Sequence, residues 1–412
     1  MKKLITLVLM LCLSISLLGC SKQEVSTNNP KLDDLNMFYN TLSKNHKNLY
    51  ANISKEELET EKNKIGENIE TMSDSDFYYS LRHLLSLVGD AHTMLDYTDA
   101  KYSYLHALPF AIVKFDDGWH LMIINDEYKD YLGTKVLSIN DIPMQEVVEK
   151  AKSIISYENE AWLETQLSNA INFKEALEYL GIINIDEDIY LTIETTDASI
   201  VQIPIIPLTE EEVQQAQLAW YERKQTPITA AQEIYRYLPL DNDTLFIQYN
   251  SCQEDPNLSM KDFAKQVETE LSSTTYNTII IDLRYNTGGN SSIINPLLNV
   301  LKKYQMKNNT QFYTLIGSST FSSGIMNSID TIEELNSTLL GSPSGGNVNG
   351  YGELKYFTLE NTPITVSYST KYFELIKDYE KDSLYPDISI PQSYENFENG
   401  VDAEIQWIMQ NK

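Results

Sequence analysis

The stretch NTIIIDLRYNTGGN, from Asn277 to Asn290, carries the strongest fold signal in the chain. Its run from Thr278 to Leu283 is mostly apolar and rich in β-branched residues, which is typical of a strand buried on both faces of a parallel sheet. Small polar residues and two glycines follow, before apolar residues from Ile293 onward recur with helical spacing. Consecutive glycines between a strand and a helix let backbone N–H groups point into a cleft, as an oxyanion site requires. A plain tight turn is the alternative interpretation.

Predicted strands and helices alternate from Thr244 to the C-terminus. Strands are expected at 245–249, 278–283, 312–316 and 338–340, and helices near residues 263, 291 and 323. This alternation predicts βαβ units and a largely parallel sheet. Because α/β sheets carry ligands beyond the carboxyl ends of their strands, we expect three of the following loops to face one cleft.

The N-terminal segment 32–88 has the apolar spacing of helices. Two predicted helices begin with a capping-box pattern, one with Ser54 and Glu57 and the other with Ser73 and Asp76. Gly89 is expected to end the third helix. His92 follows directly, in the sequence GDAHT. This position suits either a structural histidine in a turn or a catalytic one.

The middle of the chain is predicted to be rich in strands. Asp116-Asp117-Gly118 predicts a hairpin turn, and further short strands and helices are expected up to residue 206. Such a module suits either peptide binding by strand addition or a spacer between domains. Thr209 with Glu212 predicts a capped helix that runs to about Lys224 and leads into the last domain.

The composition narrows the possible partners and cofactors. At 412 residues the chain is expected to form two or three domains, and its net charge of −28 argues against nucleic acid as a partner. No Walker, HExxH or CxxC motif and no cluster of cysteine and histidine occurs in the sequence. We therefore predict neither a metal nor any other cofactor.

The first twenty residues have the pattern of a bacterial lipoprotein signal. Two lysines precede the apolar stretch 4–18, and Gly19-Cys20 follows it. Cys20 is the predicted lipidation site, and the polar segment 21–31 is the expected tether. The protein is therefore expected to be extracytoplasmic and held at a bacterial membrane by its lipid alone. Only Cys252 then remains as a free thiol, so no intramolecular disulfide is expected.

A candidate nucleophile follows the predicted strand 312–316. The sequence Thr320-Phe321-Ser322-Ser323 stands directly before a helix with apolar periodicity. A serine at such a helix start exposes its hydroxyl beside a free backbone N–H, which is nucleophile geometry. An N-cap serine is the alternative, and spacing alone does not choose between Ser322 and Ser323.

Four separated motifs, in order, resemble the C-terminal-processing (tail-specific) serine peptidases. The resemblance is to the branch with the tricorn protease core and the repeats of interphotoreceptor retinoid-binding protein. The motifs are GDAHT at 89–93, IDLRYNTGG at 281–289, TFSS at 320–323 and YEKDSLYPDI at 379–388. Gly400-Val401-Asp402 before a final helix also fits, so the resemblance runs from about residue 33 to the C-terminus.

The resemblance implies an α/β fold with a crotonase-like or ClpP-like ββα spiral catalytic core, an N-terminal helical segment and a small β-rich, PDZ-like module. Together with the element pattern it predicts these divisions: signal peptide 1–20, tether 21–31, helical segment 32–97, PDZ-like module 98–207, linker helix 208–235 and α/β catalytic domain 236–412.

The same resemblance implies roles for individual residues. Ser322 matches the nucleophile, His92 the general base, and Glu380 the glutamate that completes the catalytic set. Ser323 would lend its N–H to the oxyanion hole together with a glycine of the Gly288-Gly289 pair. Asp282 and Arg284 are interpreted as scaffold.

One departure from the tail-specific branch bears on the mechanism. Asn347 stands near the place where that branch has a lysine base, and an amide cannot accept a proton at neutral pH. A Ser–Lys dyad is thus excluded at that position. His92 remains as the base, with Lys371 as the one other lysine to consider.

Three hypotheses of function follow. The first is a lipoprotein serine peptidase that cleaves peptides or unfolded protein segments through an acyl-enzyme. The second is a catalytically inactive lipoprotein that binds a peptide or an apolar ligand on the same scaffold. The third is a hydrolase of small esters or amides. The sequence predicts no oligomeric state.

Overall fold

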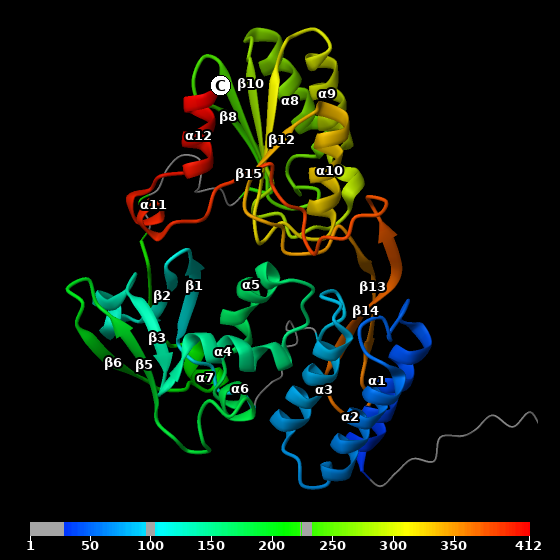
Figure 1. The fold of residues 1–412 in the computed structure, drawn as a ribbon, viewed down its shortest axis with the longest axis vertical. Helices are drawn as coiled ribbons and strands as arrows, with labels where there is room; N and C mark the ends of the chain where they lie inside the picture. Colours follow the sequence, from blue (N-terminus) through cyan, green and yellow to red (C-terminus); the bar gives the residue numbers. More distant parts are fainter. Residues whose placement is uncertain (1–28, 96–103, 223, 225–232) are drawn as a thin grey trace, which may run out of the picture.

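The computed structural model describes residues 29–95, 104–222, 224 and 233–412. The predicted signal peptide, Cys20 and most of the predicted tether lie outside these residues. In the part of the chain that is described, no helix is both long and apolar enough to cross a membrane. The described residues form an upper α/β domain and a lower body with two parts, a β-rich module and a helical segment (Figure 1).

The α/β domain is built on a six-stranded sheet with the order β15-β12-β11-β10-β9-β8. Its strands are β8 (Tyr235–Pro239), β9 (Thr244–Tyr249), β10 (Thr278–Asp282), β11 (Gln311–Ile316), β12 (Thr338–Gly341) and β15 (Ile388–Ser389). Only β8 pairs antiparallel; the pairs from β9 to β15 are parallel. The predicted parallel sheet, with the strand of residues 278–282 inside it, is confirmed.

Helices cover both faces of this sheet (Figure 1). They are α8 (Met260–Ser273), α9 (Asn295–Gln305), α10 (Ser323–Leu335) and α12 (Ala403–Asn411). The short α11 (Tyr394–Asn399) lies instead against the β-rich module, where Phe397 contacts Phe115 and Tyr221. All five residues of β10 are buried, with Ile279 and Ile281 packed toward α8 and α9 and Ile280 toward α12. The prediction from the apolar run 278–283, that this strand is buried on both faces, is therefore confirmed.

The β-rich module contains a seven-stranded antiparallel sheet in which β1-β2-β3-β5-β6 are adjacent in that order. Its strands are β1 (Phe110–Phe115), β2 (Gly118–Asn125), β3 (Lys135–Ile139), β4 (Ile142–Pro143), β5 (Ile189–Glu194), β6 (Ile200–Ile205) and β7 (Leu218–Trp220). Its helices are α4 (Met144–Ala151), α5 (Glu160–Ala170), α6 (Lys174–Tyr179) and α7 (Glu210–Val213). The hairpin predicted at Asp116-Asp117-Gly118 joins β1 to β2.

The predicted helix from Thr209 to about Lys224 is wrong beyond its first turn. The capping box of Thr209 and Glu212 is present, but α7 ends at Val213. The following segment forms β7, which pairs with Ile123–Asn125 of β2. Pairing with an existing sheet thus overrides the local helical pattern.

The N-terminal helices are α1 (Pro30–Asn45), α2 (Lys55–Asn68) and α3 (Asp74–Val88). The capping box at Ser54 is formed, Ser73 caps α3 through the Asp76 N–H, and Gly89 ends α3 with a φ of 66°. These three predictions are confirmed.

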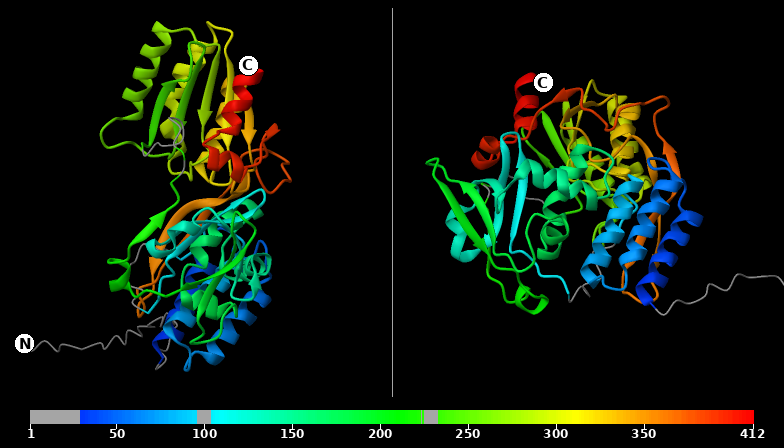
Figure 2. Two further views of the ribbon diagram at one scale, coloured as in Figure 1. Left: turned by 90° about the vertical axis from the view of Figure 1, so that its left-hand side faces the viewer. Right: turned by 60° about the horizontal axis from the view of Figure 1, so that its bottom comes forward.

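A long hairpin that the sequence pattern did not reveal joins the helical segment to the α/β domain. Its strands, β13 (Asn349–Thr358) and β14 (Thr365–Glu374), pair with each other and run down beside α1–α3 (Figures 1 and 2). Leu359, Ile364 and Val366 are buried in the same apolar core as Leu35 and Phe38 of α1. The N-terminal helices therefore pack against a segment from the C-terminal half of the chain.

The turn of this hairpin is held by one buried carboxylate. Asp34 is fully buried and accepts hydrogen bonds from the backbone N–H and side chain of both Asn361 and Thr362, at 2.8–3.0 Å. Four donors on one carboxylate offset the cost of burying its charge.

We predict that Asp34→Ala lowers the free energy of unfolding by roughly 3 kcal/mol, because four donors lose their acceptor in a buried site. Urea unfolding of the two proteins measures this difference. Glu360→Ala, at an exposed position beside the turn, is the matched control and should change stability by less than about 0.5 kcal/mol. Equal, small effects of both substitutions would contradict this account of the hairpin.

Candidate active site

Ser322 lies at the N-cap position of α10 in a strained conformation. Its φ of 51° and ψ of −122° are rare for any residue except glycine, and its side chain makes no capping hydrogen bond. The alternative interpretation as an ordinary N-cap serine is therefore wrong. Strain of this kind persists only where surrounding contacts impose it, and it is common at functional sites.

The contacts that impose this strain come from the loop after β10. The Phe321 N–H donates to the Asn286 carbonyl at 3.0 Å, and the Thr320 hydroxyl donates to the Leu283 carbonyl at 2.8 Å. Gly324 approaches Asn286 so closely that a Cβ would lie 2.3 Å from its carbonyl oxygen. The two loops after β10 and β11 are thus locked together at Ser322.

Gly288 lies directly against the serine turn. A Cβ on it would lie 2.8 Å from the Ser322 Cβ and 3.0 Å from the Ser323 nitrogen, and its φ is 109°. Its own N–H donates to the Asn286 Oδ1 at 3.0 Å. Gly288 therefore allows the loop after β10 to lie close to Ser322 and Ser323, but its N–H already donates to Asn286 and is not available to an oxyanion.

Gly289 and Ser323 are two of the residues predicted to donate to an oxyanion. Both line the same cavity as Ser322, and the Ser323 hydroxyl donates to the Gly289 carbonyl at 2.7 Å. Ser323 is the first residue of α10, where backbone N–H groups have no partner within the helix. Unpartnered N–H groups and the positive end of the helix dipole both favour a negative charge at this position.

The turn that carries His92 is fixed by β14. The Ser367 hydroxyl donates to the His92 carbonyl at 2.9 Å, and the Ser369 N–H donates to the Thr93 hydroxyl at 3.2 Å. Within the turn, the Asp90 carboxylate accepts from the His92 N–H at 2.9 Å and from the Thr93 hydroxyl at 2.6 Å. The histidine thus comes from the N-terminal segment but is held by the C-terminal half.

Asp90 is itself oriented by a second histidine, His46. The Asn48 N–H donates to His46 Nδ1 at 3.1 Å, so Nε2 carries the proton and donates to Asp90 at 2.9 Å. Burial alone would raise the pKa of Asp90, but the His46 hydrogen bond and the nearby His92 keep that pKa below its ordinary value. Asp90 is therefore a charged carboxylate, with Oδ1 3.8 Å from His92 Nδ1.

The His92 ring is packed against Phe321, the residue before Ser322. Their ring centroids lie 4.5 Å apart, and Phe321 stacks in turn on Trp162 of α5 at 4.1 Å. Neither ring nitrogen of His92 has a hydrogen-bond partner among the described residues. Burial lowers the pKa of His92, partly opposed by the charge of Asp90, so the imidazole is neutral and able to accept a proton.

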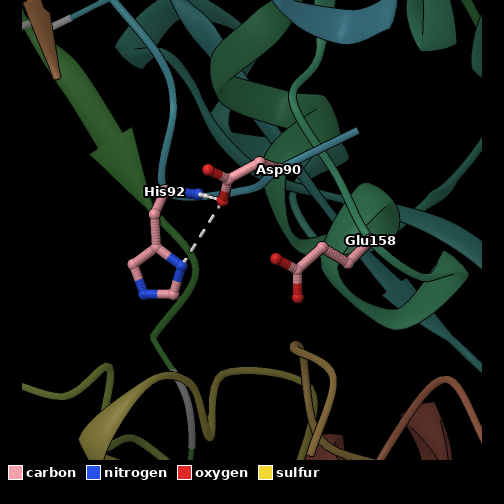
Figure 3. Close-up of side chains that lie close together, drawn as sticks. All are labelled: Asp90, His92 and Glu158. Atoms are coloured by element: carbon pink, nitrogen blue, oxygen red, sulfur yellow. Dashed lines mark hydrogen bonds and ion pairs between the residues drawn. The ribbon is translucent and has the colours of Figure 1, made fainter. Parts of the chain in front are cut away.

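A third titratable group, Glu158, reaches this site from the β-rich module. In Figure 3, the carboxyl group of Glu158 points toward the side chains of Asp90 and His92. Burial, followed by the charge of Asp90, raises the pKa of Glu158 from 4.5 to about 7. No sequence pattern pointed to Glu158, because its proximity to His92 arises only from domain packing.

These side chains surround one cavity of about 560 Å³. It is lined by His92, Glu158 and Ser322, by the loops after β10, β11 and β12, and by Gly350–Leu354 of β13. Phe321, Ile325, Met326, Val348 and Leu375 provide an apolar wall. The expectation that loops after three strands face one cleft is confirmed.

The structure does not bring Glu380 to His92. Glu380 is exposed, does not line the cavity and forms no hydrogen bond with His92, so its predicted place in the catalytic set is not supported. The carboxylates near His92 are instead Asp90 and Glu158. Ser322 and His92 both line the cavity, but no hydrogen bond joins them.

The remaining predicted positions are also located. Lys371 is exposed and forms an ion pair with Glu353 at 2.5 Å, which does not suit a catalytic base. Asn347 lines the cavity, where its N–H donates to Glu158 at 3.0 Å. Arg284 forms ion pairs with Asp282, Asp402 and Glu404, in agreement with a scaffold role.

Asp90, His92 and Glu158 are also residue types that bind metals, and their ligand atoms lie within 4.8 Å of one another. Asp90 already accepts from His46 and Thr93, and each Glu158 oxygen accepts from a backbone N–H. We therefore interpret the group as a site of proton transfer. The expectation that the protein needs no metal stays a prediction.

Comparisons with known proteins agree with this architecture. No protein-family model and no curated protein sequence matches the chain. Among solved structures, the chain is similar in fold to mature CPAF.

Mature CPAF in complex with lactacystin has a TM-score of 0.63 at 12% identity, over 93% of this chain and 97% of that one. Uncomplexed mature CPAF has a TM-score of 0.62, also at 12% identity, over 93% of this chain and 96% of that one. The photosystem II D1 C-terminal processing protease has a TM-score of 0.44 at 11% identity, over 92% of this chain and 99% of that one.

Gly288→Ala should abolish most catalytic function of the site, because the added Cβ displaces Ser322 and Ser323. A displacement of this kind is expected to reduce a hydrolytic rate, or the rate of Ser322 acylation, by about 100-fold or more. Gly181→Ala is the matched control, since Gly181 also has a positive φ of 59° but a Cβ there meets nothing within 4 Å. A Gly288→Ala protein that reacts at the wild-type rate would contradict the proposed geometry.

Glu158→Gln should alter the dependence of stability on pH. Because the folded-state pKa of about 7 lies above the ordinary 4.5, the wild type is most stable with Glu158 protonated. This contribution is complete below pH 4.5 and is lost as the pH rises through about 7. The variant cannot ionise, so its stability relative to wild type should increase with pH by about 2–3 kcal/mol. Urea unfolding between pH 4.5 and 8 measures this; a constant difference would contradict it.

Proposed function

We propose that this protein is a membrane-anchored, extracytoplasmic serine peptidase that cleaves peptides or unfolded protein segments through an acyl-enzyme. The observation that carries the proposal is the strained backbone of Ser322, whose hydroxyl caps no helix and whose residue lines the same cavity as His92. The motifs of the tail-specific peptidases and the CPAF-like fold support it.

The reaction would begin with attack of the Ser322 Oγ on the scissile carbonyl carbon. His92 accepts the hydroxyl proton as the new C–O bond forms, and it returns that proton to the leaving amine as the C–N bond breaks. Water then attacks the acyl-enzyme by the same route and regenerates the Ser322 hydroxyl. Because Ser322 and His92 share no hydrogen bond in the structure, proton transfer requires that substrate binding bring them into hydrogen-bond reach.

The negative charge that develops on the carbonyl oxygen would be stabilised by the N–H groups of Ser323 and Gly289. Gly288 contributes by close approach, because its own N–H donates to Asn286. Preorganised backbone donors of this kind stabilise a transition state by several kcal/mol.

The proposed anchor rests on the sequence 4–20, with Cys20 as the lipidated residue. A lipid at this residue and the tether 21–31 would place the cavity near the membrane surface, where flexible protein segments are substrates. The net charge of −28 agrees with an attachment through lipid and not through a basic surface.

A second candidate function is ligand binding without catalysis. It is favoured by the absence of a Ser322–His92 hydrogen bond and by the apolar wall that Phe321, Val348 and Leu375 give the cavity. An apolar ligand or a peptide side chain would occupy the cavity in that case.

Covalent labelling separates the two functions. A fluorophosphonate probe should phosphonylate Ser322 of the wild-type protein with loss of fluoride, and it should fail to label Ser322→Ala and His92→Ala, because it needs an activated serine. Ser323→Ala should react roughly 3- to 10-fold more slowly, since it keeps the backbone N–H but loses the hydrogen bond to Gly289. Labelling and peptide hydrolysis that persist in Ser322→Ala would contradict the assignment.

Lactacystin offers an independent probe, since it has been captured in complex with CPAF, which has the same fold. Under the proposal it blocks fluorophosphonate labelling of Ser322. A wild-type protein that neither hydrolyses peptides nor reacts with either probe would favour the ligand-binding function.

A further inference from the structure

Glu158 occupies an unusual position for a carboxylate that the sequence motifs do not include. It belongs to the β-rich module, two residues before the start of α5, yet it lines the cavity of the α/β domain. One of its carboxyl oxygens lies within 4.8 Å of both a carboxylate oxygen of Asp90 and a ring nitrogen of His92. Figure 3 shows the carboxyl groups of Asp90 and Glu158 on the same side of the His92 ring.

The Glu158 carboxylate connects two loops that come from distant parts of the chain. Its Oε1 accepts from the Ala91 N–H at 3.4 Å, and its Oε2 accepts from the Asn347 N–H at 3.0 Å. Ala91 is the residue next to His92, and Asn347 lies in the loop after β12. One carboxylate therefore holds the histidine turn against the far wall of the cavity.

The neighbouring residue, Asn159, makes this position rigid. Its Nδ2 donates to the Ser344 carbonyl at 3.2 Å, the Asp382 carbonyl at 2.7 Å and the Ser383 hydroxyl at 2.9 Å. Its Oδ1 accepts from the Trp162 N–H at 2.9 Å and so caps α5. The main chain at residues 158–159 is thus attached to the α/β domain, and Glu158 is not a mobile surface acid.

From this geometry we propose that Glu158 is the positioning carboxylate of His92, in the role that the sequence motifs assign to Glu380. The proposal rests on the proposed peptidase function. It means that the β-rich module supplies a part of the active site and is more than a binding module or spacer.

The role follows from the charge that catalysis places on His92. When the imidazole takes the Ser322 proton it becomes a cation in a buried site, and nearby carboxylates stabilise that cation. Among the described residues, Asp90 and Glu158 are the carboxylates grouped with it, and Glu353 and Tyr351 line the same cavity. Asp90 holds the turn from within through the His92 N–H, and Glu158 holds it from the β-rich module through the Ala91 N–H.

The pH dependence distinguishes Glu158 from a structural residue. With its pKa near 7, Glu158 gains its charge in the range where the rate of a histidine-based peptidase rises. Glu158 and His92 titrate as a linked pair, because the charge of each stabilises the charge of the other. Glu158→Gln removes the partner charge, so the pKa of His92 should fall further below its ordinary value.

The test compares Glu158→Gln with Glu380→Gln, the rival carboxylate, and with Glu160→Gln, an exposed control on the same segment. Steady-state hydrolysis of a flexible peptide is measured from pH 5 to 9 in the full chain. We expect Glu158→Gln to lower kcat by roughly 10- to 100-fold with little change in KM, and to shift the acidic limb of kcat/KM to lower pH. The two other variants should stay within about two-fold of wild type at every pH.

Two outcomes would overturn the proposal. The first is a Glu158→Gln enzyme with the wild-type pH profile, whether or not its rate falls, because a purely structural role moves the rate alone. The second is a large loss in Glu380→Gln, which would return the role to that residue.

A measurement that does not need activity separates this proposal from the peptidase function. The pKa of His92, followed by NMR in the Ser322→Ala background, should be lower in Glu158→Gln than with Glu158 present. An unchanged His92 pKa would overturn the positioning role even if the wild type proves to be a peptidase. A lowered pKa in a protein that does not label at Ser322 would support the contact between Glu158 and His92 while rejecting the peptidase function.

Discussion

The hydrogen bonds between β14 and the turn that carries His92 are the contacts on which the site depends. Ser367 and Ser369 reach the turn at residues 92–93 from a strand about 275 positions further along the chain. The same hairpin is held at its far end by Asp34 of α1. Because both ends of the hairpin are attached to the N-terminal segment, the base and the nucleophile keep a defined relation although they come from different halves of the chain.

Close backbone approach is the second constraint, and it explains the glycines around Ser322. Gly288 and Gly324 lie where any side chain would meet the backbone of the facing loop. The loops can therefore lock Ser322 into its positive φ, and the stability of the surrounding sheet compensates for that strain. The result is a serine whose hydroxyl is presented to the cavity and is not used to cap α10.

Three parts of the chain meet at the aromatic stack of His92, Phe321 and Trp162. The stack joins the helical segment, the α/β domain and the β-rich module in a single contact. Glu158 and Asn159 reinforce the same junction with hydrogen bonds. A change in the placement of the β-rich module would therefore act directly on His92, and this makes the proposed role of Glu158 physically reasonable.

Much of the fold could be predicted from local patterns. The cap residues Ser54 and Ser73 and the hairpin at 116–118 are present, because each depends on interactions between residues close in sequence. The strand at 278–282 pairs with β9 and β11, which are distant in sequence, but its near-continuous apolar run indicates burial on both faces. The helix expected to reach Lys224 failed, since Leu218–Trp220 pairs with a strand almost 100 residues earlier. The β13–β14 hairpin was missed, and its stability comes from packing on α1–α3.

Local sequence patterns were enough to identify the chemical groups and their settings: a serine at a helix start, a histidine just after a helix end, and two glycines after a buried strand. Which carboxylates lie near His92 could be learned from the folded chain alone. Asp90 is close in sequence, but Glu158 reaches the site through domain packing, and Glu380 remains exposed. The physical reason is that a charge interaction depends on distance in space, and long-range packing alone sets that distance.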